Sequence, residues 1–107
     1  MRVLIDECLN WRLSRALTGH YCVSVQRLGW SGRRNGELLR LATEHLFDAF
    51  LTGDRNLACQ QHSARIGLAV IVLEAEGTGL HQTLPLMPKV LAILPSLRPG
   101  QVVRVGP

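Results

Sequence analysis

Short apolar runs recur along the chain, and the segments between them carry apolar residues at a different, helix-like spacing. Runs of this length that are rich in valine, isoleucine and leucine are typical of β-strands. They predict five strands, over residues 2–5, 21–26, 49–52, 68–73 and 101–105. The unbroken run at 68–73 is typical of a central strand buried on both faces, whereas 101–105 predicts an edge strand.

The first two segments between the strands carry leucine and alanine at three- and four-residue intervals, which gives each of them one apolar face. Helices are predicted over residues 9–18, 36–46, 56–63 and 79–94. Asn35 is a favourable cap for the second helix, and Pro85 and Pro88 constrain the early part of the last one. This alternation predicts an α/β fold, a three-layer sandwich with a mostly parallel central sheet of four to five strands.

Length and composition narrow the class of protein. The chain has 107 residues, of which 47% are hydrophobic, so we expect a single domain over residues 1–107 with a sizeable core. No apolar run approaches the roughly 20 residues that span a bilayer, so we expect no membrane partner. Acids follow the first apolar run too early for a signal peptide. We therefore expect a cytoplasmic location.

The net charge of +4 permits a polyanionic partner, and all but one of the 12 basic residues are arginine. Arginine suits phosphate because its planar fork bonds two oxygens at once, although a GC-rich genome would also favour arginine. Cys8, Cys22 and Cys59 are odd in number and form no C-x-x-C pair. They predict free thiols rather than a zinc site or a disulfide framework.

Three acids are placed where the predicted topology would bring them to one edge of the sheet. Asp6 and Asp54 directly follow predicted strands, and Glu37 lies in the first turn of the second helix. In an alternating parallel fold these positions share the edge where ligands bind. Each acid also has a simpler interpretation, because Asp6 and Asp54 are good helix caps and Glu37 is favourable in a first turn.

Carboxylates that converge repel one another unless a cation neutralises them. Mg²⁺ and Mn²⁺ prefer such oxygen ligands, and a bound ion can activate water and brace a phosphate. The three acids therefore predict a divalent metal site of the kind used by nucleases. Glu7 is an additional candidate ligand or a solvent-facing side chain, while Glu44 and Asp48 are expected at the opposite edge.

Three stretches of the chain, VLIDECL, LGWSGRRNGELLRLA and FDAFLTGDRNL, resemble the PIN-like domain family that is often found in bacterial toxin–antitoxin operons. The TGDRNL segment is similar to the family's Thr-x-Asp-(Lys/Arg)-(Asp/Asn)-(Phe/Leu) motif. The resemblance covers nearly the whole chain. It implies a PIN-type fold, a Mg²⁺ or Mn²⁺ cofactor and ribonuclease activity, with an RNA substrate and a cognate antitoxin protein as partners.

Carried over residue by residue, Asp6 and Asp54 match the family's metal-binding aspartates, and Glu37 matches its helix-borne acid. Two positions depart from the pattern, because Asn35 and Asn56 stand where many relatives carry acids. The asparagines keep an amide oxygen but bring no charge. They leave open a second interpretation, a catalytically weak or inactive interaction domain of the same fold that binds a partner protein or RNA.

The same loops carry candidate substrate-binding residues. Arg33 and Arg34 precede the helix acid and Arg55 follows Asp54, so their guanidinium groups are placed to hold RNA phosphates. Asn35 and Asn56 are the polar candidates beside them. Solvated loop charges are the alternative for the arginines. Trp11 is expected on a helix surface or in an interface, and a homodimer is compatible with so small a domain.

Overall fold

The computed structural model describes residues 1–56 and 67–107. It contains a sheet of five parallel strands, in the order β2-β1-β3-β4-β5. The strands are β1 (Arg2–Ile5), β2 (Tyr21–Ser24), β3 (Ala49–Thr52), β4 (Ala69–Leu73) and β5 (Val102–Val105). The α/β fold and the parallel sheet predicted from the alternation are confirmed. The predicted helix over 56–63 lies, beyond Asn56, outside the described residues.

Strands β1 and β3 begin and end where the apolar runs predicted, and β4 and β5 each begin one residue later. Every residue of β3 and β4 is buried, as the continuous apolar sequence of these interior strands predicted. The second strand is shorter than predicted, because the chain turns after Ser24, where the N–H of Leu28 and that of Arg27 bond to its carbonyl and hydroxyl oxygens.

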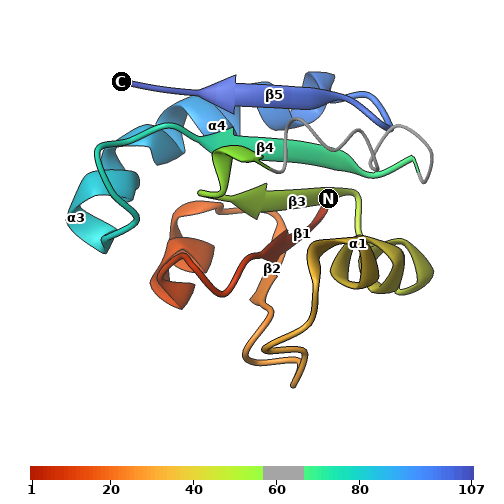
Figure 1. Ribbon diagram of the computed structural model, residues 1–107. Coiled ribbons are helices and arrows are strands. Elements are labelled where there is room, and N and C mark those ends of the chain that lie inside the picture. The colour runs from red at the N-terminus through yellow and green to blue at the C-terminus, as the bar shows by residue number, and fades with distance from the viewer. Residues whose placement is uncertain (57–66) are drawn as a thin grey trace.

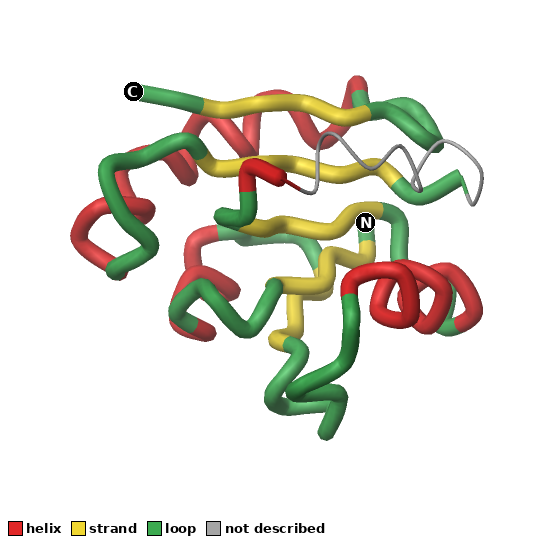
Figure 2. The backbone as a smooth tube through the Cα atoms, in the orientation of Figure 1, coloured by secondary structure: helices red, strands yellow, loops and turns green. Residues whose placement is uncertain are grey.

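Helices cover both faces of the sheet, which makes three layers (Figures 1 and 2). Alternate strand residues point to opposite faces. One core joins the strands to η1 (Trp11–Ala16), η3 (Leu84–Leu86), α4 (Met87–Ile93) and η4 (Leu94–Ser96). The other core joins them to α1 (Asn35–Glu44). Leu4 and Phe50 thus pack toward α1, while Val3, Ile5 and Leu51 pack toward η1 and α4.

Two connections of the sheet have opposite handedness. The chain steps from β1 to β2 toward one edge of the sheet and from β4 to β5 toward the other. Both connections lie on the same face, where α4 contacts η1. Crossovers that run in opposite directions over one face have opposite hands, so the strong preference for right-handed crossovers is broken once. The strands remain parallel, and their carboxyl ends still share one edge.

Two predicted helices are shortened or interrupted. The helix predicted over 9–18 is a short 3-10 helix, because Asn10 starts it late and Leu17 leaves helical geometry. The helix predicted over 79–94 is divided into α3 (Leu80–Thr83), η3, α4 and η4. The last three segments each have a proline as their second residue, Pro85, Pro88 and Pro95, where a missing N–H interrupts the helical ladder.

Cys8 and Cys22 are free thiols, as predicted. Burial raises the pKa of both, that of Cys22 to about 11. Within residues 1–56 and 67–107, no helix has the length and apolar character that crossing a membrane requires.

Candidate metal centre at the carboxyl end of the sheet

The register of two neighbouring strands places Asp6 beside Thr52. Ile5 of β1 pairs with Leu51 of β3, so the next residue of each strand lies at the same level. The N–H of Asp6 donates to the carbonyl of Leu51 at 2.9 Å, which continues the ladder by one residue. The Asp6 carboxylate is buried, with 6% of the residue exposed, and its Oδ2 accepts the hydroxyl of Thr52 at 2.7 Å.

Thr52 also connects Asp6 to Asp54. Its fully buried hydroxyl oxygen accepts the N–H of Asp54 at 3.0 Å while the hydroxyl proton goes to Asp6. One side chain therefore fixes both predicted aspartates, and this link has no counterpart in the sequence prediction. The clue was the residue type, because a hydroxyl at the end of a fully buried strand needs partners of its own.

Gly53, between Thr52 and Asp54, packs closely against Thr78 and Leu9. A Cβ at this position would lie 2.8 Å from Cγ2 of Thr78 and 3.3 Å from Cδ2 of Leu9. The first distance is shorter than carbon atoms tolerate, so the close approach of the loop after β4 requires a glycine here. The Thr-Gly-Asp sequence thus positions Asp54 for steric reasons as well as through hydrogen bonds.

Asn35 reaches the same cluster from the helix. Its Nδ2 donates to Oδ2 of Asp54 at 3.3 Å. The prediction that Asn35 caps the helix is wrong: Arg34 is the N-cap residue, makes no side-chain cap bond, and Asn35 is the first helical residue. The amide is instead used across the site, so Asp6, Thr52, Asp54 and Asn35 form one hydrogen-bonded chain.

Asp6 and Asp54 differ in whether they act as caps, the simpler role considered for both. Asn10, not Asp6, caps η1 through a 2.9 Å bond from the N–H of Arg12. The Oδ1 of Asp6 accepts the N–H of Glu7 at 2.8 Å. The Oδ1 of Asp54 accepts the N–H of Asn56 at 3.0 Å, which is a local turn of the kind the alternative anticipated. Asp6 is therefore not explained by capping, and Asp54 is only partly explained by it.

The carboxylates of Glu37 and Glu7 contact other groups rather than Asp6 or Asp54. Glu37 is in the first turn of α1, as predicted, but its carboxylate forms an ion pair with Arg33, one turn earlier. Glu7 is exposed, and its Oε1 accepts the N–H of Gly32 at 3.0 Å. The structure therefore joins Asp6 to Asp54 and leaves Glu37 and Glu7 outside their hydrogen-bonded chain.

The predicted substrate-binding residues surround this end of the sheet. Arg33 is occupied by Glu37, whereas the side chain of Arg34 is exposed and has no hydrogen bond or ion pair within the described residues. The guanidinium of Arg55 donates to the carbonyl of Ala75 at 2.9 Å. Asn56 contacts Asp54 through its backbone N–H. Of these candidates, Arg34 is the most available to a phosphate.

The carboxylate oxygens of Asp6 and Asp54 are suitable ligands for a hard divalent cation. Asp6 and Asp54 have no ion-pair partner within residues 1–56 and 67–107. Each carboxylate oxygen offers about two lone pairs, and Oδ1 of Asp6 and both oxygens of Asp54 accept one hydrogen bond each. Free lone pairs therefore remain on both acids. In this part of the chain, however, no three His, Cys, Asp or Glu side chains are grouped so that they could hold a metal.

Cys8 also lies beside Asp6 and Thr52, which was not predicted from the sequence. Its Sγ lies 3.5 Å from Oδ2 of Asp6 and 3.9 Å from Oγ1 of Thr52. Partial burial raises the pKa of this thiol, and the nearby Asp6 carboxylate raises it further. A protonated thiol donates a weak hydrogen bond to Asp6 and is a poor nucleophile. Covalent chemistry by Cys8 is therefore not favoured.

Comparison of the chain with family models, with curated proteins and with solved structures finds no match.

Proposed function

We propose that the chain is a divalent-metal-dependent ribonuclease that hydrolyses RNA phosphodiester bonds. The observation that carries the proposal is the Thr52 hydroxyl, which donates to the Asp6 carboxylate and accepts the backbone N–H of Asp54. Within residues 1–56 and 67–107, neither acid is in an ion pair. Carboxylates brought to one edge of a sheet repel each other unless a cation neutralises them. Asp6 and Asp54 would hold Mg²⁺ or Mn²⁺, with Glu37 as a third ligand once it separates from Arg33.

The protein groups have separate tasks in this proposal. Thr52 and Asn35 orient the two aspartates, and Gly53 lets the loop after β4 lie against them. Arg34 holds a phosphate of the RNA strand at the rim, and Arg33 and Arg55 assist when they exchange their present partners for phosphate. When bound, the ion supplies an activated water and neutralises charge on the phosphate.

The resemblance to PIN-like proteins extends the proposal to the biological role. We infer that the chain is the toxin of a toxin–antitoxin pair, that it acts in the cytoplasm, and that its partner is a cognate antitoxin protein. Expression of the wild-type chain in a bacterial host should then arrest growth, and the Asp54→Asn variant should not.

The direct test is cleavage of labelled single-stranded RNA by the purified chain with Mn²⁺, Mg²⁺ or EDTA. Asp6→Asn and Asp54→Asn should each lower the metal-dependent rate by at least about a hundredfold, because each removes a charged metal ligand. Asp48→Asn is the matched control, since Asp48 lies at the opposite end of the sheet. Circular dichroism confirms that the variants fold. Cleavage that survives in Asp6→Asn/Asp54→Asn protein would overturn the proposal.

One observation favours the second candidate, a non-catalytic interaction domain. Both aspartates already accept protein donors, Glu37 is ion-paired, and Asn35 and Asn56 bring no charge. Calorimetric titration with Mn²⁺ separates the two functions. A nuclease site binds the ion in the wild-type protein and not in Asp6→Asn/Asp54→Asn protein, whereas an interaction domain gives no binding heat in either.

A further inference from the structure

Strand β2 is an open edge of the sheet. It pairs with β1 on one side only. The N–H groups of Tyr21 and Val25 donate to the carbonyls of Met1 and Ile5 at 3.0 and 2.8 Å, so the odd-numbered residues face β1. Because backbone groups alternate in direction along a strand, the N–H groups of Cys22 and Ser24 face outward. Within residues 1–56 and 67–107 these two N–H groups are free to bond a further strand, while the carbonyl of Ser24 already accepts the N–H of Leu28.

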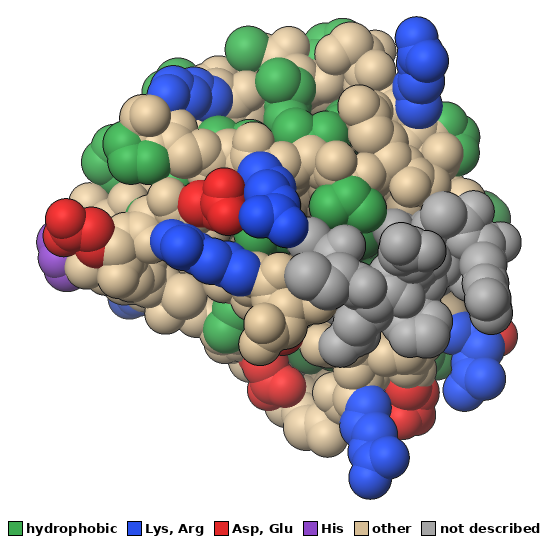
Figure 3. Space-filling model, turned by 45° about the horizontal axis from the view of Figure 1, so that its top comes forward, with side chains coloured by type: hydrophobic (Ala, Val, Ile, Leu, Met, Phe, Trp, Pro, Cys, Tyr) green, Lys and Arg blue, Asp and Glu red, His purple; other side chains and the backbone are tan. Residues whose placement is uncertain are grey.

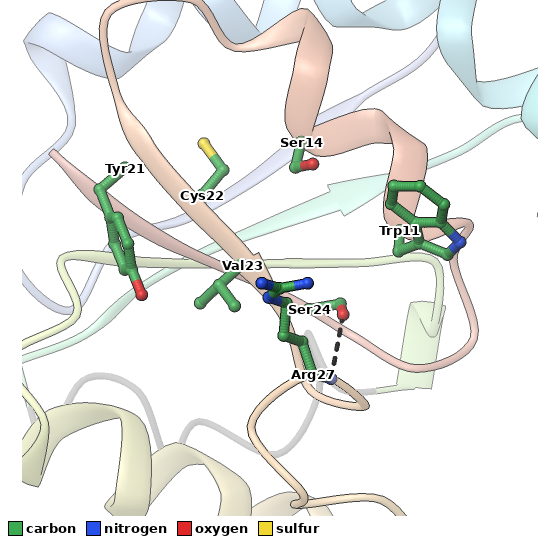
Figure 4. A pocket seen from close by; sticks show the side chains of 7 residues that line it. All are labelled: Trp11, Ser14, Tyr21, Cys22, Val23, Ser24 and Arg27. Carbon is green, nitrogen blue, oxygen red and sulfur yellow. Dashed lines mark hydrogen bonds between the residues drawn. The ribbon is translucent and has the colours of Figure 1, made fainter.

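A groove runs beside this edge. Trp11 and Ser14 of η1 form one wall, the residues of β2 form the other, and Arg27 closes one end (Figure 4). Its volume is about 330 Å³. It continues into an open hollow of about 590 Å³ beside Trp11, Ser24, Gln26 and Arg27. The outward backbone groups therefore lie next to space that side chains of an added strand can fill.

Arg27 lines the groove, and Arg12 and Arg15 lie over the ring of Trp11, which also lines it. Arg12, Arg15 and Arg27 are exposed, and neither ion pair found within residues 1–56 and 67–107 includes them. The guanidinium carbons of Arg12 and Arg15 lie 4.7 and 5.0 Å from the centre of the Trp11 ring. Cation–π contacts of this kind hold the two charges beside the groove.

The opposite edge of the sheet is different. At β5, Arg104 pairs with Glu74, and Lys89 donates to the carbonyl of Gly106 at 2.8 Å. On the side seen in Figure 3, some basic side chains lie next to acidic ones and others stand alone. The difference between the edges is that a basic side chain at β5 is ion-paired, whereas Arg12, Arg15 and Arg27 are in neither ion pair of residues 1–56 and 67–107.

We propose that the β2 edge binds an extended, acidic segment of a partner protein, which adds a sixth strand to the sheet. In strand addition, main-chain hydrogen bonds, here to Cys22 and Ser24, provide affinity for any extended segment. Pockets for the side chains provide selectivity. The arginines select glutamate or aspartate at alternate positions of the segment. This proposal is independent of the metal centre and of ribonuclease activity.

The aromatic residues of the groove argue against RNA as its occupant. A base needs a free ring face on which to stack. The Trp11 ring already carries two guanidinium groups, and the Tyr21 ring carries that of Arg2, 4.7 Å from its centre, and lies against Phe47. A second copy of the chain is disfavoured as well, because it would bring like-charged arginines of both copies together.

The test uses the full chain and a fluorescein-labelled peptide in which glutamate and valine alternate. Fluorescence anisotropy should show binding that weakens with salt, and the matching lysine–valine peptide should not bind. Arg15→Glu/Arg27→Glu should weaken binding by at least about tenfold. Arg40→Glu/Arg98→Glu is the matched control, since both arginines are exposed away from the groove, and should change binding by less than about twofold.

Amide hydrogen exchange followed by NMR reports the mode of binding. The peptide should slow exchange at Cys22 and Ser24 and leave the β5 edge unchanged. Absence of binding at millimolar peptide, equal binding of the lysine peptide, or unchanged exchange at Cys22 and Ser24 would each overturn the proposal. So would displacement of the peptide by a uridine oligonucleotide in Asp6→Asn/Asp54→Asn protein, or a dimer that Arg15→Glu/Arg27→Glu dissociates. None of these results depends on RNA cleavage.

Discussion

The two ends of the parallel sheet both carry aspartates at strand termini, but in different surroundings. At the amino end, Asp48 is exposed and alone, and its Oδ2 accepts the N–H of Arg2 at 2.8 Å. The Arg2 guanidinium donates to the carbonyl of His45 and lies over the Tyr21 and Phe47 rings. This arrangement extends and covers β1, although Nε of Arg2 is buried and has no hydrogen-bond partner within residues 1–56 and 67–107.

At the carboxyl end, Asp6 is buried and shares Thr52 with a second acid, Asp54. The link to Asp54 runs through its backbone N–H, and burying the Asp6 carboxylate is electrostatically costly unless hydrogen bonds or a cation compensate. The difference teaches that the position of an acid at a strand end is weak evidence for function. Burial and the presence of a second carboxylate distinguish a candidate site from a structural one.

Mn²⁺ should produce the largest difference between the two ends. A ligand at about a hundred times its dissociation constant stabilises the folded state by about 2.7 kcal/mol. We expect this gain in the wild-type chain and in Asp48→Asn protein, measured as a shift of the urea midpoint with and without Mn²⁺. Asp6→Asn/Asp54→Asn protein should show no shift. An equal shift in all three proteins would place the ion elsewhere.

Thr52→Val should give the next largest effect. The substitution keeps the shape of the side chain but removes the donor to Asp6 and the acceptor for the N–H of Asp54. Leaving buried polar groups without partners costs about 1–3 kcal/mol of the free energy of unfolding. The control is Thr43→Val in α1, where the hydroxyl only bonds back to the carbonyl of Leu39, and a change below about 0.5 kcal/mol is expected. Similar urea midpoints for the two variants would contradict a special role for Thr52.

Asp48→Ala should give the smallest effect. It removes one exposed hydrogen bond to Arg2, which is worth about 1 kcal/mol or less. Urea denaturation measures this loss, with the exposed Glu44→Ala as its control. RNA cleavage and the Mn²⁺-induced stabilisation should be unchanged. If Asp48→Ala protein lost RNA cleavage or the Mn²⁺-induced stabilisation, the two ends of the sheet would no longer differ in function.

The strands were predictable because buried strands carry continuous apolar runs that are visible in the sequence. The bounds of β1 and β3 followed from their apolar runs, and the register of Ile5 with Leu51 then brings Asp6 and Thr52 together. The long last helix was not predicted correctly, because each proline removes an N–H and also restricts the preceding residue. The effect is a series of short segments rather than one constrained start.

Side-chain contacts across loops were the least predictable part of the site. Glu37 lies in the expected first turn, but its partner is Arg33, and that choice depends on the path of the loop before α1. Asn35 bonds to Asp54 rather than to its own helix for the same reason. The groove beside β2 is formed by the packing of η1 against an edge strand, and no local motif encodes it.

The close packing of Gly53 predicts that a second substitution can compensate for its replacement. A methyl group added there would meet Cγ2 of Thr78, a residue that lies far along the chain and carries no chemistry of its own. Gly53→Ala should therefore be harmful alone and be relieved by Thr78→Ser, which removes the opposing methyl group. Positions 53 and 78 would then behave as a suppressor pair, and variation in the loop after β4 would determine which substitutions the Thr-Gly-Asp segment tolerates.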